Sequence, residues 1–218
     1  MSRRSASWMS VIVLGVFVLS GALAAAEPAP VKLPAPRMTG GMPLMQALAA
    51  RHSEREFGAQ AIAPQALSNL LWAAWGINRP DGHRTAPSAS NRQVIEIYVT
   101  LPEGAYLWDA KTNTLNPVAE GDLRGATGSQ PFAAAAALNL VLVADTSKAG
   151  RPAADPQQAL NIGVDAGTIV ENVYLFCASE GLASVVRASV PKDALARHLK
   201  LRDTQLIVVA QSVGYPKK

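Results

Sequence analysis

The stretch DPQQALNIGVDAGTIVENVYLFCASEG, from Asp155 to Gly181, decides which folds this chain can adopt. Asp155 is a typical N-cap residue, the proline that follows it suits the first turn of a helix, and Gly181 is a typical C-terminal cap. Between the caps, apolar residues cover most of the circumference of a helix, among them Ile162, Val164, Ile169, Val170, Val173, Leu175 and Phe176. A helix that is apolar nearly all round is buried. We therefore expect one long central helix with the other elements packed around it.

The flanking segments predict strands and shorter helices. Residues 138–144 form a continuous apolar run, which is typical of a strand buried on both faces. Residues 94–101 alternate and are rich in β-branched side chains, which indicates a second strand. Short strands are predicted over 183–186 and 205–213, a hairpin over 106–115, and helices over 43–51, 64–75, 131–137 and 192–199. This order predicts an α+β fold, a mixed sheet flanked by helices with the long helix buried at its centre.

Composition excludes several classes of protein. The chain has 218 residues, of which 49% are hydrophobic, and this is ample for a core. One cysteine excludes a disulfide framework within the chain and any Cys-rich zinc module. The three histidines are dispersed without metal-ligand spacing, so we expect no metal site. The net charge of +4 is scattered without runs of like charge, and nothing supports nucleic-acid binding.

The N-terminus has the pattern of a secretory signal peptide. Arg3 and Arg4 precede an apolar run over 11–23, and three alanines follow it before Glu27. We expect residues 1–26 to be removed, 27–41 to be a Pro-rich leader and 42–218 to be the functional domain. The protein would then work in the periplasm if the cell is Gram-negative. The sequence leaves open whether export uses the general or the twin-arginine route.

The segment Arg51 to Phe57, RHSEREF, follows the first predicted helix. Arg51 and Arg55 offer planar donor forks, and Ser53 between them adds a hydroxyl, a combination that suits a phosphate. Taken by itself, the same segment also fits a solvated helix C-terminus, where Arg and His52 interact favourably with the helix dipole.

The segment PSASNRQ, residues 87–93, lies in a polar loop before the predicted strand at 94–101. Its amides and hydroxyls can both donate and accept hydrogen bonds, as binding of a heterocycle requires. An ordinary turn rich in Ser and Asn has the same composition, so this segment alone is also ambiguous.

In this order and spacing, the two segments resemble the nitroreductase family of FMN flavoproteins. The stretch from Asp165 to Leu182 is similar to the family's central helix, and VGYP at 213–216 is similar to its C-terminal strand end. The predicted hairpin GAYLWDAKTNTL, at 104–115, looks like the branch that contains the SagB-type azoline oxidases, although the catalytic Lys–Tyr pair of those enzymes is not identifiable. The resemblance runs from Pro43 to the C-terminus.

The resemblance implies an obligate homodimer with two FMN sites at the interface. Arg51, His52, Ser53 and Arg55 match the motif for the phosphate and ribityl chain, and Lys217 stands where family members have a basic tail. The loop that reaches FMN, partly from the second subunit, is matched by Pro87, Ser88, Ala89, Asn91 and Gln93. The family transfers electrons in two steps through the flavin, which carries the redox chemistry. No catalytic side chain can be assigned from the sequence.

Three functional hypotheses follow. The chain is an exported FMN oxidoreductase acting on small organic molecules, or a degenerate flavin-binding member with a binding or assembly role, or, if the resemblance is false, a secreted binding module. No GxGxxG segment offers a separate dinucleotide site, and export removes the protein from the cytoplasmic NAD(P)H pool. We therefore hypothesise that a quinol, a periplasmic redox protein or the substrate itself supplies the electrons.

Overall fold

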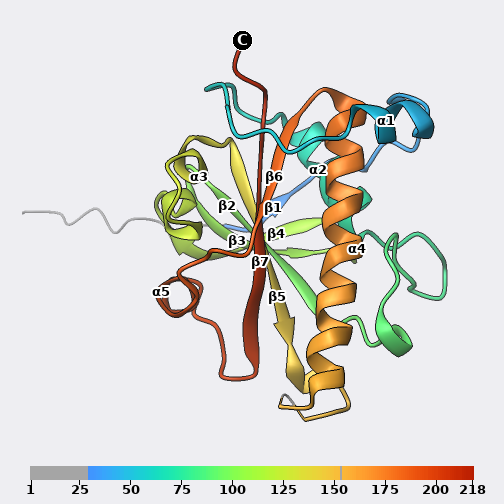
Figure 1. The fold of residues 1–218 in the computed structure, drawn as a ribbon, viewed down its shortest axis with the longest axis vertical. Helices are drawn as coiled ribbons and strands as arrows, with labels where there is room; N and C mark the ends of the chain where they lie inside the picture. Colours follow the sequence, from blue (N-terminus) through green and yellow to red (C-terminus); the bar gives the residue numbers. More distant parts are fainter. Residues whose placement is uncertain (1–28, 153) are drawn as a thin grey trace, which may run out of the picture.

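The computed structural model describes residues 29–152 and 154–218. Its centre is a seven-stranded sheet with the order β1-β4-β3-β2-β5-β7-β6 (Figure 1). The strands are β1 (Val31–Lys32), β2 (Ile95–Leu101), β3 (Gly104–Asp109), β4 (Thr114–Glu120), β5 (Leu138–Asp145), β6 (Ala183–Arg187) and β7 (Gln205–Gly214). The α+β fold is confirmed, and the residues expected to form signal peptide 1–26 lie outside the described range.

The sheet is antiparallel where we expected a mixed one. Every strand pair of the described residues is antiparallel. Strands β5 and β6 do point the same way, as strands joined by a crossover helix do. They are not neighbours, because β7 lies between them and runs antiparallel to both. The return of the C-terminal strand into the middle of the sheet therefore removes the parallel contact.

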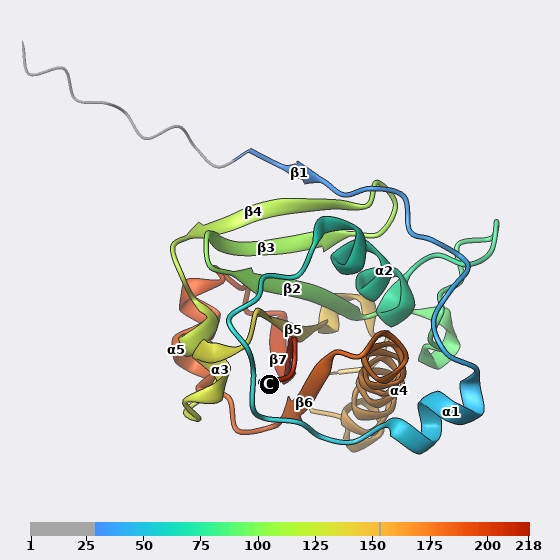
Figure 2. The same ribbon diagram turned by 90° about the horizontal axis from the view of Figure 1, so that it is seen from above.

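Helices cover both faces of the sheet (Figure 2). They are α1 (Leu44–Ala50), α2 (Pro64–Trp75), α3 (Phe132–Ala135), α4 (Pro156–Glu180) and α5 (Lys192–His198). Helices α2 and α4 pack on one face and enclose the main core, whereas Leu195 and Leu199 of the α5 region pack on the other. Strand β5 lies between the two cores with all eight of its residues buried, which confirms the interpretation of its continuous apolar run.

The long helix begins and ends as its sequence predicts. The Asp155 carboxylate accepts a hydrogen bond from the backbone N–H of Gln157 at 2.9 Å, and Gly181 caps the other end with a left-handed φ of 68°. Its burial differs from the expectation, because only one face packs on the sheet. On the opposite face Leu160 and Val164 are 59% and 55% exposed. The helix flanks the sheet of one subunit and is not enclosed by it.

Helix α1 and the leader also differ from the expectation. Leu44, Met45 and Leu48 recur at helical spacing, but they are 63%, 75% and 45% exposed and do not enter the core. The leader is packed against the domain along part of its length: β1 pairs with β4, and Leu33 is only 4% exposed. Among the described residues, no helix is both long enough and apolar enough to cross a membrane.

Candidate functional site

The loop after α1 carries the first predicted motif to the end of strand β6. The backbone N–H of Glu54 donates to the carbonyl of Ser184 at 2.9 Å. The chain then pairs with its own C-terminus, through a bridge between Phe57 and Pro216 and a 2.9 Å hydrogen bond from Lys217 N–H to the Glu56 carbonyl. The structure thus brings Lys217 beside the segment from Arg51 to Arg55, although more than 160 positions separate them in the sequence.

Tyr174 of α4 anchors this loop. Its hydroxyl lies 2.9 Å from Ser53 Oγ and accepts a 2.9 Å hydrogen bond from the backbone N–H of Val186. The Arg51 guanidinium lies over the Tyr174 ring at 5.4 Å from its centroid, within the range of a cation–π interaction. One aromatic side chain therefore positions two of the predicted phosphate-binding residues and ties them to β6.

The charges of this loop suit an anionic group. Arg51, Arg55 and Lys217 form no ion pair with any residue that the structure describes. The Glu54 carboxylate is occupied, since the backbone N–H groups of Glu56 and Arg55 donate to it and lower the pKa of Glu54 below its usual value. The His52 Nδ1–H donates to the Ala50 carbonyl at 2.8 Å, and the His52 ring is largely exposed. Arg51, Arg55, Lys217 and the Ser53 hydroxyl are candidate donors for a phosphate, and His52 stays a predicted contact.

The second predicted motif is anchored on the same helix by Asp165. Ser88 Oγ donates to Asp165 Oδ2 and the backbone N–H of Ala89 donates to Asp165 Oδ1, both at 3.0 Å. Asp165 is only 4% exposed. Ser90, Asn91 and Gln93 adopt positive φ angles near 50°, a conformation that is uncommon outside glycine and that a packed environment must hold. The carboxylate therefore fixes the shape of the loop.

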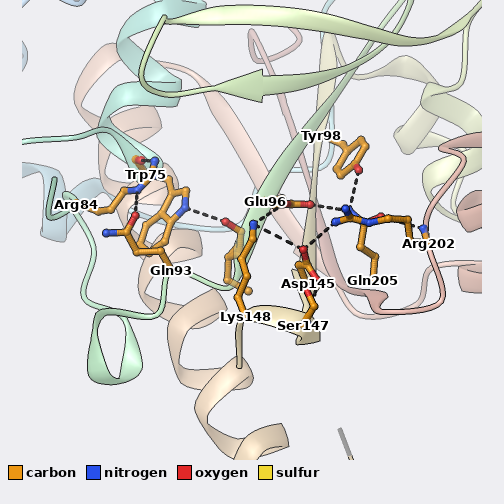
Figure 3. A network of polar contacts seen from close by, with 11 residues as sticks. Trp75, Arg84, Gln93, Glu96, Tyr98, Asp145, Ser147, Lys148, Arg202 and Gln205 are labelled. Carbon is orange, nitrogen blue, oxygen red and sulfur yellow. Dashed lines mark hydrogen bonds and ion pairs between the residues drawn. The ribbon is translucent and has the colours of Figure 1, made fainter. Parts of the chain in front are cut away.

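The Gln93 amide is used inside the loop and is not free for a ligand. Its Nε2 donates to the carbonyl of Gly82 and to Asn91 Oδ1, both at 3.0 Å, and its Oε1 accepts from Arg84 Nε at 2.8 Å. Arg84 in turn lies over the Trp75 ring at 5.1 Å. Figure 3 shows Gln93, Arg84 and Trp75 of this group side by side. Pro87 and Asn91 are exposed, and the Asn91 amide N–H₂ remains available.

The two motifs are not brought together in one subunit. Their anchors, Asp165 and Tyr174, are nine positions apart on α4, which corresponds to roughly 13 Å along a helix. The Arg51 loop lies toward the C-terminal end of α4 near α1, and the Ser88 loop lies toward its N-terminal half (Figure 1). Within one chain, the two motifs therefore lie at different positions along α4.

The remaining candidate side chains have structural roles. Cys177 is buried, and burial raises the pKa of its thiol to about 12, so it packs as a small apolar residue. His83 lies in the polar loop with its Nδ1 2.9 Å from Asp81 Oδ1. Trp75 is in the core, while Trp72 is only partly buried. Over the described ranges, no three His, Cys, Asp or Glu side chains group as metal ligands would.

The sequence model of the Nitroreductase family matches residues 48–215. The chain belongs to the nitroreductase family. A Methanocaldococcus jannaschii protein whose name assigns it as a nitroreductase is 26% identical over 176 residues, which are 76% of this chain and 88% of that protein. A crystal structure from Ralstonia eutropha, titled a nitroreductase, is 39% identical with a TM-score of 0.82, covering 89% of this chain and 92% of the other.

Structures of lower sequence identity show the same fold. The NADPH:FMN oxidoreductase of Vibrio harveyi, solved with NAD⁺, has a TM-score of 0.60 at 20% identity, over 80% of this chain and 69% of the other. Nitroreductase A of Vibrio parahaemolyticus has a TM-score of 0.60 at 22% identity, over 80% and 68%. At these identities the likeness concerns the fold alone.

Sequence reasoning missed the two anchors, Tyr174 and Asp165. Both are buried on the long helix, on opposite sides of it, and both are polar residues within an apolar pattern. A buried polar side chain has a hydrogen-bonding partner. That rule could have identified them as residues that hold another segment, although it could not have named Ser53 and Ser88 as the partners.

Proposed function

We propose that this chain is an exported FMN-dependent oxidoreductase that acts on small organic molecules in the periplasm. The observation that carries the proposal is the Tyr174-anchored loop, where Arg51 lies over the ring whose hydroxyl contacts Ser53 and where the Lys217 backbone pairs with Glu56. Arg51, Arg55 and Lys217 form no ion pair among the described residues. A phosphate monoester carries nearly two negative charges near neutral pH. Membership of the nitroreductase family makes FMN the ligand that this loop would hold.

The chain's own residues would bind and orient the flavin. Arg51, Arg55 and Lys217 would hold its phosphate, with Ser53 as a further donor. The backbone and Asn91 of the Ser88 loop would contact the flavin bound to the other subunit. When bound, FMN supplies the two-step electron transfer, while the protein positions it and tunes its electronics. The anchors Tyr174 and Asp165 would act by keeping both loops in shape before the flavin binds.

A homodimer is part of this proposal, and the exposed face of α4 supports it. Leu160 and Val164 are exposed there. Gly163 and Gly167 lie on the same side, and a Cβ added at either would meet nothing within 4 Å. Small residues allow a second backbone to approach closely, and exposed apolar side chains favour association. A second subunit on this face would also supply the motif that one subunit leaves too distant.

Export and the electron donor are further parts of the proposal. The Arg-flanked apolar run at 11–23 and the alanines before Glu27 support export. Because an exported protein is separated from cytoplasmic NAD(P)H, we propose a quinol, another periplasmic redox protein or the oxidised substrate as the donor. Stopped-flow reduction of the bound flavin tests this: fast, saturable reduction by micromolar NADH or NADPH would contradict it. The hairpin β3–β4 supports a relationship to the SagB-type branch, without its azoline chemistry.

Purification followed by a turnover assay tests the function. The freshly isolated protein is expected to be yellow, with flavin absorbance at one FMN per chain, and to reoxidise with a quinone or a nitroaromatic compound after chemical reduction. A colourless protein that takes up no FMN would refute the proposal. Bound FMN without turnover of any such acceptor would instead favour a degenerate family member with a binding or assembly role.

A further inference from the structure

A cavity of about 500 Å³ opens beside the Ser88 loop. Its volume falls within the range of small-molecule sites, about 300–1,000 Å³. One wall comes from the loop itself and the start of the following strand, a second from the turn after β5, and a third from the N-terminal part of α4. The lining side chains that matter to its chemistry are Arg92, Arg151, Gln158, Asn161 and Asp165.

The side-chain oxygens of Asp165 and Asn161 in this lining already accept hydrogen bonds. Both oxygens of Asp165 accept hydrogen bonds, from Ser88 Oγ–H and from Ala89 N–H. The Asn161 side-chain oxygen accepts from Gln157 Nε2 at 3.0 Å, which leaves the Asn161 N–H₂ group as a donor. The groups that remain for a ligand are therefore mostly donors.

Two of these donors have no partner of their own. Gln158 is only 3% exposed, yet its side chain makes no hydrogen bond to any residue over 29–152 or 154–218, and it lines the cavity. Because the polar atoms of the Gln158 side chain reach the cavity, a ligand or a water molecule there can supply their hydrogen bonds. The Arg92 guanidinium likewise forms no ion pair within the described ranges.

The wall opposite the loop is held rigidly. Asp145 accepts hydrogen bonds from Ser147 and from Arg202, the latter at 2.7 Å, and Lys148 pairs with Glu96 at 2.6 Å (Figure 3). Burial raises the pKa of the Asp145 carboxyl, but the Ser147 hydrogen bonds and the nearby cations together lower it below its usual value. The next residues are Ala149 and Gly150, which enter the cavity wall.

Arg92 lies flat against this wall. A Cβ at Gly150 would collide with the Arg92 guanidinium, so the absence of a side chain there lets the guanidinium reach across the turn. Arg151 follows, with one guanidinium N–H donated to Asp155 at 2.9 Å and the others left over. Two guanidinium groups thus line a cavity that also contains the buried Gln158 side chain.

We propose that this cavity binds the oxyanion of a small organic ligand, a carboxylate or a phosphate, and that this selects anionic substrates for the adjacent flavin. Arg92 would bind the oxyanion through its planar fork, and Gln158 would donate to it from below. The selection of anionic substrates rests on the proposed function, because the Ser88 loop would reach the flavin of the other subunit. An uncharged apolar ligand would offer neither the Arg92 guanidinium nor the Gln158 amide a hydrogen-bonding partner.

Binding is measured first, by calorimetry on the purified full-length dimer with benzoate, phenyl phosphate and the neutral isostere benzamide. We expect benzoate or phenyl phosphate to bind at least tenfold more tightly than benzamide, and the tighter of the two identifies the oxyanion. Arg92→Met should weaken that binding about tenfold to a hundredfold. Gln158→Glu, nearly the same in shape, should weaken it further through repulsion. Arg197→Met, an exposed arginine on α5, is the matched control and should change nothing.

Kinetics then separate this inference from the proposed function. With the photoreduced flavoprotein, Arg92→Met should raise the KM for 4-nitrobenzoate about tenfold or more and leave that for 4-nitrobenzamide unchanged. Equal binding of benzoate and benzamide, no binding of either anion at ten millimolar, or equal effects of Arg92→Met and Arg197→Met would overturn the inference. Failure of the protein to bind FMN would overturn the proposed function instead, while calorimetry would still report on the cavity.

Discussion

Tyr174→Phe isolates the hydroxyl that joins the Arg51 loop to the sheet. The substitution keeps the ring beneath Arg51, so the cation–π contact at 5.4 Å is retained. It removes the hydroxyl that lies 2.9 Å from Ser53 Oγ and that accepts from the Val186 N–H at 2.9 Å. Because Tyr174 is only 6% exposed, water does not readily replace these partners. Tyr174→Phe therefore measures the loss of these hydrogen bonds without a loss of the packing of the ring.

The expected magnitudes follow from these two hydrogen bonds. Each contributes about 0.5–1.5 kcal/mol net, and an N–H left unpaired adds to the cost, so the free energy of unfolding should fall by about 1–3 kcal/mol. In a domain of this size each kcal/mol shifts Tm by roughly 2–4 °C. Without its hydrogen bond to Tyr174, Ser53 no longer holds the Arg51 loop in place. A loss of about 1 kcal/mol of binding free energy would lower the affinity for FMN about fivefold.

The assay compares Tyr174→Phe with Tyr98→Phe. Tyr98 is 4% exposed and lies in the cluster on the other face of the sheet, where its hydroxyl accepts a 3.2 Å hydrogen bond from Gln205. Thermal unfolding and FMN fluorescence titration are measured for both variants. Both should lose stability, but only Tyr174→Phe should lose FMN affinity. Unchanged FMN affinity in Tyr174→Phe, at a reduced Tm, would refute the assignment of this loop to the phosphate.

Four further predictions concern binding, assembly, the thiol and export. Arg51→Ala should weaken FMN binding about tenfold to a hundredfold, through loss of one charge-assisted pair, while Tm measured by circular dichroism changes little; equal affinity in a fluorescence titration would contradict this. Leu160→Glu combined with Val164→Glu should give monomers without bound flavin in sedimentation, and a variant that remains a flavin-loaded dimer would place the interface elsewhere. Cys177 should resist thiol reagents in the native state, and because its pKa is raised from 9.0 to about 12, only the unfolded state ionises between those values. Stability should therefore fall as pH rises through that window, by up to about 1.4 kcal/mol per pH unit, and should do so less in Cys177→Ala. Mass spectrometry of the protein from its native host should show a chain beginning near Glu27, and an intact N-terminus would contradict export.

Local sequence determined most of the secondary structure. The caps at Asp155 and Gly181, the proline at the start of α2 and the continuous apolar run of β5 all act over a few residues. The conformation at such positions depends on the neighbouring residues and on the spacing of apolar residues along the chain. Both can be read directly from the sequence. The motif at Arg51–Phe57 is contiguous as well, and its resemblance to the nitroreductase family was therefore visible without coordinates.

Tertiary structure decided how these elements meet. The insertion of β7 between β5 and β6 made the sheet antiparallel. Leu160 and Val164 of α4 are exposed because only the opposite face of the helix packs on the sheet. The anchoring of Ser53 by Tyr174 joins segments more than a hundred positions apart. The cavity near Arg92 likewise needs three distant segments. The physical reason is that contacts between remote segments depend on packing of the whole chain, and a buried group such as Gln158 has no local signal of what it will face.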